Sequence, residues 1–298
     1  MIRTAGNQFD PGEGYAYFIA SNVDRMRWGQ ACHTHLLIAV NELKTEADLT
    51  VVESWLDAGR KVFVDSGIFN LTNEHARKHN VRMDEALALA PEEIDGFDEL
   101  LTKYRATLAR FGDRVWGYIE LDQGGRENKI KTRAMLEAVG LRPVPVYHPL
   151  NDGWDYFDEL AGRYDRICFG NIVQASRPDR LRLIATAWER RQKYPELWIH
   201  LLGFTPSEWL IAFPVNSGDS SSWLSAVQWS GYKPRTCCAA FGSLPAAYQY
   251  ELGSDPTGAS GNQKATRMSA HGVYIHQRNW QAVVGAYAEA GFDPRGTA

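Results

Sequence analysis

The sequence has no long hydrophobic run and few cysteines. Its longest apolar segments, at residues 15–20 and 36–40, are far shorter than the roughly 20 residues that a membrane-spanning helix needs. The N-terminal residues lack the apolar core of a signal peptide. Four cysteines in 298 residues favour reduced thiols over a disulfide framework. We therefore expect a cytoplasmic protein that makes no contact with membranes.

The sequence also lacks an excess of positive charge and the glycine-rich loops that bind phosphate. It has 32 Lys and Arg against 36 Asp and Glu, a net charge of -4. This balance excludes a surface coated in positive charge for nucleic acid, although a local basic groove stays open. There is no G-x-G-x-x-G or G-x-x-x-x-G-K-S/T motif, so the usual reason to predict an open doubly wound sheet is missing.

Short β-rich segments alternate with longer segments of helical periodicity. Strands are predicted over Tyr15–Ser21, His35–Asn41, Lys61–Gly67, Val115–Asp122, Arg142–His148, Arg166–Gly170, Leu197–Phe204, Phe213–Ser217 and Thr236–Phe241. Helices are predicted over Asp95–Phe111, Ile130–Val139, Trp154–Tyr164, Arg177–Lys193, Thr205–Phe213 and Trp280–Ala290. This alternation predicts an α/β fold, a (β/α)₈ TIM barrel, in one domain over residues 1–298. The barrel core is expected at about 14–245 and a C-terminal loop and helical appendage at 246–298.

Polar residues stand where several predicted strands end. Asp65, Asp122 and His148 each end a strand, Asn171 follows another, and Asp219 lies just past the segment FPVNSG. The carboxyl ends of barrel strands meet on one face, where active sites lie, so we expect these side chains to converge. Each one taken singly is explained as a cap of the following helix. Their recurrence on successive strands favours a functional site.

Three segments together resemble a known enzyme family. VDSGIFNL (64–71), ICFGNIV (167–173) and HLLGFTPSEWLIAFPVNSGDSSSW (200–223) resemble, in order, the D-S-G-G-F-Q, G-G-L-A and L-x-G-x-G-x-P to D-x-x-D segments of the tRNA-guanine transglycosylase superfamily. The pairing of D-S-G with S-G-D-S-S-S-W is closer to the phage and bacterial branch that inserts 7-deazaguanines into DNA. The resemblance covers residues 62–223, with a weaker echo at 276–279.

The resemblance implies exchange of a base at C1′ of a nucleoside through a covalent glycosyl-aspartate. Asp219 matches the nucleophile, and Asp65 matches the aspartate that protonates the departing guanine and deprotonates the incoming base. Asp122 matches the carboxylate that accepts hydrogen bonds from N1–H and the exocyclic amine of a guanine-type base. The remaining residues expected at the base pocket are Ser66, Gly67, Phe69, His148, Gly170, Asn171 and Gly203.

The resemblance also implies the partners, which are double-stranded DNA and a free 7-deazaguanine base such as 7-cyano-7-deazaguanine. Trp223, Tyr232, Lys233 and Arg235 are expected to contact the nucleic acid, because aromatic and cationic side chains bind flipped nucleotides. The last three belong to the segment WSGYKPR (229–235), which an ordinary surface segment with buried aromatic residues explains equally well. The compartment is the host cytoplasm if a phage encodes the chain, and the oligomeric state stays open.

The sequence departs from the family pattern in ways that keep other functions open. Asn216 replaces the first Asp of D-x-x-D, and the C-x-C-x-x-C…H zinc motif is absent. The adjacent Cys237 and Cys238 are a poor tetrahedral set even with a downstream histidine, so we expect no metal and no cofactor. The alternatives are a tRNA-guanine transglycosylase, a retaining nucleosidase or glycosidase, and a non-catalytic binding subunit.

Overall fold

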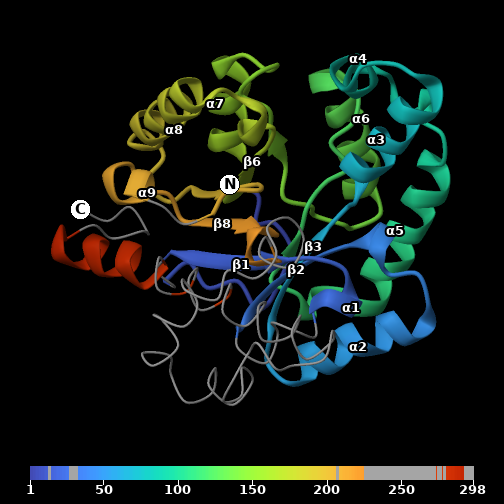
Figure 1. Ribbon diagram of the computed structural model, residues 1–298, viewed down its shortest axis with the longest axis horizontal. Helices are drawn as coiled ribbons and strands as arrows, with labels where there is room; N and C mark the ends of the chain where they lie inside the picture. The colour runs from blue at the N-terminus through green and yellow to red at the C-terminus, as the bar shows by residue number, and fades with distance from the viewer. Residues whose placement is uncertain are drawn as a thin grey trace, which may run out of the picture.

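A computed structural model describes residues 1–12, 15–26, 33–205, 208–224, 273, 277 and 280–291. In this part of the chain, eight parallel strands form one curled sheet in the order β4-β3-β2-β1-β8-β7-β6-β5 (Figure 1). The strands are β1 Ala16–Ala20, β2 His35–Ala39, β3 Lys61–Asp65, β4 Gly117–Tyr118, β5 Val146–Tyr147, β6 Arg166–Phe169, β7 Trp198–Leu201 and β8 Ser217–Ser220.

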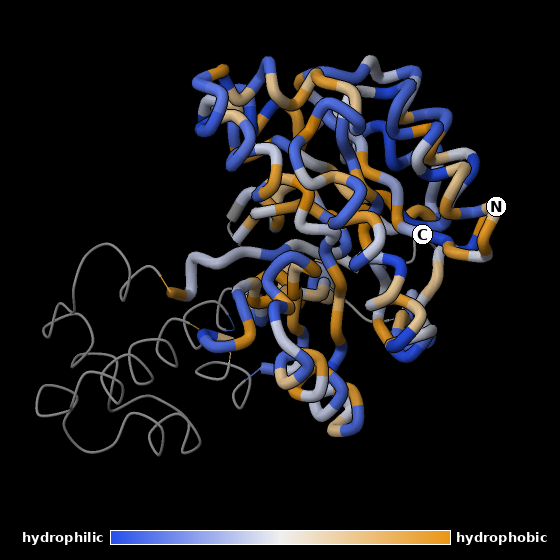
Figure 2. The backbone as a smooth tube through the Cα atoms, turned by 90° about the vertical axis from the view of Figure 1, so that its right-hand side faces the viewer, coloured by the Kyte–Doolittle hydropathy of each residue, from blue (hydrophilic) through white to orange (hydrophobic). Residues whose placement is uncertain are grey.

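Helices occupy the connections between successive strands. They are α1 Val23–Met26, α2 Glu46–Asp57, α3 Ile68–His79, α4 Met83–Ala88, α5 Phe97–Phe111, α6 Gly125–Ala138, α7 Trp154–Arg163, α8 Arg177–Arg191 and α9 Glu208–Ala212. The tube in Figure 2 alternates between hydrophobic and hydrophilic residues along these helices, as expected when one face packs on a core. Among the described residues, no helix is both long and apolar enough to cross a membrane.

The two end strands of the sheet also approach each other. A parallel bridge pairs Ile119, just after β4, with Val144, just before β5. Val144 N donates to Tyr118 O at 2.8 Å, and Glu120 N donates to Val144 O at 3.1 Å. The strand order and this bridge are compatible with a TIM-like fold, in which all carboxyl ends of the strands face the same way.

Local sequence signals explain where several elements begin. Thr45 and Asp48 form a reciprocal capping box at the start of α2, which satisfies backbone N–H groups that have no partner inside the helix. Ser176 caps α8 by accepting from Asp179 N at 3.3 Å. Gly67 starts α3 with φ at 81°, a left-handed conformation that favours glycine, and it turns the chain directly after β3.

The observed strands differ from the sequence prediction mainly at β8. The predicted strand Phe213–Ser217 is wrong, because the chain pairs over Ser217–Ser220 instead and Asp219 lies inside the strand opposite Phe18 of β1. Small polar residues hide this strand from a search for apolar runs. The predicted strand Thr236–Phe241 lies outside the described residues, as does most of 246–298.

Large aromatic side chains fill the inside of the sheet below the carboxyl ends of the strands. The Trp116 ring lies 4.9 Å from Phe18 and 4.8 Å from Phe63, measured between centroids. Phe9, from the N-terminal segment, contacts both Trp116 and Trp198 edge-on at 5.1 Å. Close packing of this kind excludes water, so among the described residues this end of the sheet is closed to a ligand.

Arg166, at the start of β6, joins the N-terminal segment to the sheet. Its guanidinium donates to Thr4 Oγ1 at 2.5 Å, Trp116 O at 2.6 Å and Ala5 O at 2.7 Å. The side chain is 1% exposed, and the group lies 4.1 Å from the centre of the Phe9 ring. The planar fork of an arginine therefore pairs three buried acceptors at once.

The C-terminal residues 280–289 are helical and pack near β8. Val283 and Tyr287 of this segment are buried in the main hydrophobic core. Tyr287 Oη donates to Leu210 O at 2.7 Å and accepts from Val215 N at 3.1 Å. This segment therefore supports the chain where it enters β8.

Replacing Arg166 by Leu is expected to destabilise the protein strongly, by about 2–5 kcal/mol, because a buried hydroxyl, a buried carbonyl group and a partly buried one lose their donor. Urea unfolding followed by circular dichroism measures the change. The control is Arg82→Leu, which removes an arginine that is 74% exposed and paired with Asp84. That change should stay within about 0.5 kcal/mol. Equal effects of the two substitutions would contradict the assignment.

Candidate functional site

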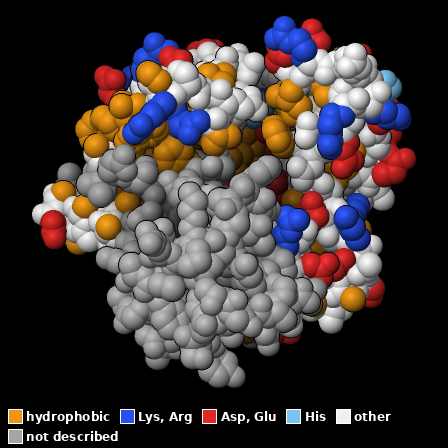
Figure 3. All heavy atoms as spheres, in the orientation of Figure 1, with side chains coloured by type: hydrophobic (Ala, Val, Ile, Leu, Met, Phe, Trp, Pro, Cys, Tyr) orange, Lys and Arg blue, Asp and Glu red, His pale blue; other side chains and the backbone are white. Residues whose placement is uncertain are grey.

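A cavity of about 780 Å³ opens at the carboxyl ends of the strands. The space-filling view shows a hollow with hydrophobic side chains at its edge, between two groups of helices (Figure 3). The lining residues come from the carboxyl ends of the eight described strands and from the segments that follow them. Those that the argument below uses are Arg25, Asp65, Phe69, Asp122, His148, Gly170, Asn171, Val173, Gly203, Thr205, Asp219, Ser220 and Ser222.

Three carboxylates line this cavity, each from a different part of the sheet. Asp65 ends β3, Asp122 follows β4, and Asp219 lies in β8. They do not form a group whose oxygen atoms lie close enough to share one metal ion. They are near enough to interact electrostatically, because the charges of Asp122 and Asp219 both act on Asp65. Their ionisation states are therefore coupled.

Asp65 holds a proton more easily than an ordinary aspartate does. Burial, and then the negative charges of Asp122 and Asp219, raise its pKa to about 7. Backbone N–H groups of the following turn only partly offset this rise, and the bond from Gly67 N to Oδ1 is long, at 3.4 Å. An acid with a pKa near neutrality can both give and take a proton, which is what general acid–base catalysis requires.

The pKa of Asp122 is shifted in the opposite direction, downward. Burial alone would raise its pKa, but the hydrogen bond and the charge of His148 outweigh burial and hold the pKa below its usual range. His148 Nε2 lies 2.9 Å from Asp122 Oδ2. Gly170 leaves room for this histidine, since a Cβ there would lie 2.7 Å from the ring. Asp122 is therefore an ionised acceptor in the cavity wall.

A buried ion pair between Lys129 and Asp152 holds the backbone of His148 in place. Lys129 Nζ donates to Asp152 Oδ2 at 2.6 Å, and the same oxygen accepts from His148 N at 2.9 Å. Lys129 is fully buried. Arg133, one turn further along α6, is also buried and donates to Glu120 at 2.9 Å. Both cations pair with carboxylates inside the protein.

Two donors fix one oxygen of Asp219. Its Oδ1 accepts from Gly203 N at 3.0 Å and contacts His200 Nε2 at 3.1 Å. No described residue donates to Oδ2, and the side chain is 9% exposed. Because Asp219 lines the cavity, Oδ2 is the oxygen that stays available to a ligand.

A chain of hydrogen bonds determines which His200 nitrogen carries the proton. The Trp198 indole, which can only donate, donates to Ser217 Oγ at 2.7 Å. Ser217 Oγ lies 2.8 Å from His200 Nδ1, so its hydroxyl proton is available to that nitrogen. The ring proton then lies on Nε2 and faces Asp219. Through this chain of hydrogen bonds, the imidazole of His200 orients Asp219. His200 lies inside the sheet and is 1% exposed.

Hydroxyl groups surround the rim on the β8 side. Thr205 Oγ1 donates to Ser220 Oγ at 3.0 Å and lies 2.8 Å from Ser222 Oγ. Ser220 Oγ also lies 2.8 Å from Tyr17 Oη. These groups exchange donors and acceptors easily, so the rim suits a ligand with several hydroxyl or ether oxygens.

Two exposed apolar side chains and one amide complete the cavity wall. Phe69, at the start of α3, is 51% exposed, and Val173, after β6, is 43% exposed. Asn171 stands between β6 and Val173 with φ at 44°. Its Oδ1 is buried without a hydrogen-bond partner among the described residues. An unsatisfied acceptor of this kind is costly unless a ligand supplies a donor.

The structure brings most of the expected site residues together. Asp65, Phe69, Asp122, His148, Gly170, Asn171, Gly203 and Asp219 all line the cavity. Ser66 and Gly67 are not among the lining residues. Ser66 is fully buried, and its Oγ accepts from Ile68 N at 3.4 Å, so these two residues shape the turn between β3 and α3.

The expectation that Trp223 stacks on nucleic acid is wrong. This side chain is fully buried, and its Nε1 donates to Ala20 O at 3.1 Å. It packs in the core because the chain turns inward after β8. Tyr232, Lys233 and Arg235 lie outside the described residues, as do Cys237 and Cys238.

One replaced residue has a structural role, and two histidines near β2 lie outside the cavity. Asn216, which stands in place of a family aspartate, is 1% exposed, and its Oδ1 accepts from Ile199 N at 2.8 Å. It therefore joins β7 to β8 below the cavity. His33 and His35 lie before and at the start of β2, at the end of the sheet away from the cavity.

His200 and Ser217 are the functional candidates that the sequence analysis missed. Side chains alternate between the two faces of a strand, so Trp198 and His200 share one face of β7, as Ser217 and Asp219 share one face of β8. This two-residue spacing was the available signal. It was hidden because the predicted strand Phe213–Ser217 begins four residues before the start of β8 and ends three residues before its end.

No protein-family model and no curated protein matches the chain. The geometry of the cavity therefore carries the functional argument.

Replacing Asp65 by Asn should raise the free energy of unfolding at pH 8 by about 2–4 kcal/mol. The reason is that the folded pKa of about 7 lies above the unfolded value of 3.8. The wild type therefore loses stability as the pH rises through that interval, whereas the variant does not. Urea unfolding from pH 4 to pH 8 measures the difference, which should vanish near pH 4.

Asp122→Asn is the matched control in the same cavity. Its folded pKa is lowered, so its ionised form contributes stability above the unfolded pKa, and this is lost as the pH falls. The substitution should destabilise the protein at pH 8 and matter less in acid. If Asp65→Asn raised the free energy of unfolding equally at every pH, the result would be inconsistent with a raised pKa of Asp65.

Proposed function

We propose that the protein is a base-exchange transglycosylase that replaces guanine in DNA by a preformed 7-deazaguanine base. The observation that carries this proposal is the set of three carboxylates in one cavity with divergent roles. Asp65 has a pKa of about 7, Asp122 has a lowered pKa, and Asp219 presents one oxygen to the cavity. An acid, an acceptor and a nucleophile are the three groups that the exchange needs. The proposal includes a closed (β/α)₈ barrel.

In the first step, Asp219 Oδ2 forms a bond to C1′ of the nucleoside. The bond between C1′ and the glycosidic nitrogen breaks, and its electron pair leaves with guanine. Protonated Asp65 supplies the proton that neutralises the departing base. Gly203 N and His200 hold Oδ1, so Oδ2 attacks from a fixed position, which lowers the entropic part of the barrier.

In the second step, the incoming base takes the place of guanine. Ionised Asp65 accepts a proton from its ring nitrogen, and that nitrogen attacks C1′. The bond from C1′ to Asp219 breaks, and its electron pair returns to the carboxylate. Because the same groups act in both directions, the enzyme is expected to exchange guanine for guanine as well.

The cavity suits a flat base with donors on one edge. Asp122 is held ionised by His148, so it accepts hydrogen bonds and cannot donate them. Asn171 lines the cavity, and its Oδ1, buried and without a described partner, becomes a second acceptor when the side chain turns toward the base. Phe69 and Val173 supply apolar surface for the faces of the ring. A guanine-type edge, with N1–H beside an exocyclic amine, complements these acceptors.

The sequence form S-G-D-S-S-S-W and the absence of the zinc motif favour DNA over tRNA as the polymer. Arg25 is the one Lys or Arg among the described residues that line the cavity. It stands on α1 at the rim and replaces Trp223 as the described candidate for a nucleic-acid contact. The hydroxyl groups of Thr205, Ser220 and Ser222 lie on the same rim and suit a sugar–phosphate backbone.

Asp219→Asn should abolish both exchange of labelled guanine and incorporation of the deazapurine, because both pass through the same covalent intermediate. Incorporation of radiolabelled base into DNA measures the loss. His200→Gln removes the orienting imidazole and keeps Asp219, so it should lower kcat by up to about 100-fold with little change in KM. Near-normal exchange by Asp219→Asn would refute the mechanism, and release of guanine without incorporation would favour a nucleosidase.

Cells that express the protein and receive a 7-deazaguanine supply should contain the modified nucleoside in DNA and not in tRNA. Mass spectrometry of nucleosides digested from each polymer makes the comparison, with Asp219→Asn as the inactive control. Modified tRNA with unmodified DNA would overturn the choice of polymer and leave the chemistry intact.

Arg25→Ala should weaken DNA binding and its salt dependence, since one phosphate contact is lost, and leave affinity for the free base unchanged.

A further inference from the structure

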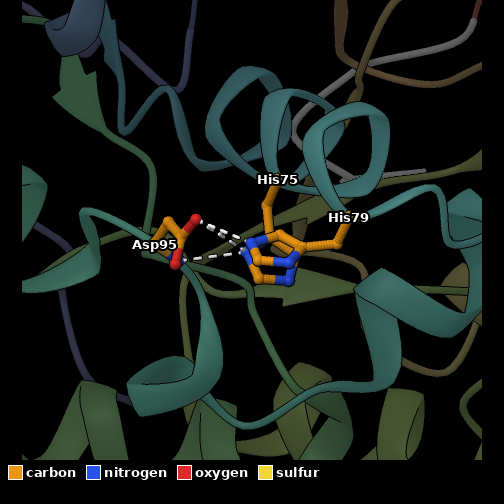
Figure 4. Close-up of side chains that lie close together, drawn as sticks. All are labelled: His75, His79 and Asp95. Atoms are coloured by element: carbon orange, nitrogen blue, oxygen red, sulfur yellow. Dashed lines mark hydrogen bonds and ion pairs between the residues drawn. The ribbon is translucent and has the colours of Figure 1, made fainter.

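Two histidines and one aspartate form a compact cluster outside the cavity. His75 and His79 lie one turn apart on α3, with ring centroids 4.3 Å apart, and Asp95 comes from the chain just before α5. Figure 4 shows all three side chains pointing toward one another. Within the described residues, this is the one group of three His, Cys, Asp or Glu side chains with potential ligand atoms within 4.8 Å of one another.

We propose that His75, His79 and Asp95 bind a divalent transition-metal ion, with Zn²⁺ as the ion to test. Two imidazoles and a carboxylate are ligands that Zn²⁺ accepts, with water in a fourth position. Ligand bonds of 2.0–2.1 Å in a tetrahedral site place two ligand atoms about 3.3 Å apart. The distances from Asp95 Oδ2 to His79 Nε2 and to His75 Nδ1, 2.8 Å and 3.8 Å, lie on either side of that value.

The present contacts show how the cluster accommodates positive charge. The backbone N–H of Asp95 donates to His75 Nδ1 at 3.2 Å, so a metal ion bound at Nδ1 replaces this hydrogen bond. Lys78 Nζ contacts Asp95 Oδ2 at 2.6 Å, and it occupies the carboxylate that the metal would use. Asp95 is 45% exposed, and the usual pKa of an aspartate lies well below neutral pH. The carboxylate is therefore ionised and attracts cations.

Displacing the lysine requires little rearrangement. Lys78 is 69% exposed, so its ammonium group can move into solvent when a divalent ion arrives. His75 is 8% exposed and His79 is 45% exposed, which leaves one side of the cluster open to water. Two of the ligands lie on one helix, which holds them in place before the ion binds.

A bound ion would tie α3 to the segment that starts α5. This matters for the cavity because α3 begins with Ile68, Phe69 and Asn70, which line it. The metal would then be a structural clamp on the helix that carries Phe69. The site is independent of the proposed transglycosylase chemistry, and it differs from the cysteine-rich module that the family uses.

The test is calorimetric titration of ZnCl₂ into the full-length protein after removal of metal by chelator. We use the Cys237→Ser, Cys238→Ser background so that thiols do not bind zinc. One saturable equivalent is expected, together with a higher melting temperature in the presence of Zn²⁺. His79→Gln and Asp95→Asn should each weaken binding at least about tenfold. Lys78→Gln should tighten it, because the competing ammonium group is gone.

Asp84→Asn is the matched control, since Asp84 is an exposed carboxylate that pairs with Arg82 at 2.5 Å and has no histidine beside it. It should leave zinc affinity unchanged. Circular dichroism establishes that each variant is folded. Absence of saturable binding to the parent protein would overturn the proposal. Unchanged stoichiometry and affinity in the His79→Gln and Asp95→Asn variants would do so equally.

Discussion

The burial of three carboxylates in one cavity, together with the repulsion among them, is the constraint on which the rest of the site depends. Two of them cannot stay ionised beside the third at no cost, so the protein distributes the charge unevenly. His148 holds Asp122 ionised, whereas nothing cationic contacts Asp65 in the described structure and its pKa rises to about 7. Similar residues thereby acquire different chemical roles through their neighbours alone.

The opposite end of the sheet supplies the rigidity that such a site needs. Trp116, Phe63 and Phe18 fill the interior, and Arg166 binds the N-terminal segment across its base. His200 stands at the junction, with its ring against Phe63 at 5.0 Å and its Nε2 on Asp219. The packed core therefore fixes the orientation of the carboxylate at the cavity floor. Stability and chemistry are separated along the strand direction, as in other parallel α/β proteins.

Much of the fold could be predicted from the sequence, because hydrophobic periodicity and caps act locally. The strands at β1, β2, β3, β6 and β7 and the helices α5, α7 and α8 lie within a few residues of their predicted positions. β8 could not be found in this way, since Ser217–Ser220 is polar and its strand conformation comes from pairing with β1 and β7. The predicted strands at β4 and β5 are longer than the observed ones for the same reason, because pairing between strands decides where each strand ends.

The sequence by itself determined which polar residues stand at strand ends, and with parallel strands that was enough to bring Asp65, Asp122 and Asp219 to one cavity. It could not decide how these groups differ, because the pKa of a carboxyl depends on burial and on neighbours distant in the chain. It also could not separate Trp223, which tertiary packing buries, from a surface aromatic. The link between His200 and Asp219 likewise exists only after β7 and β8 pair, since hydrogen bonds between strands are set by register.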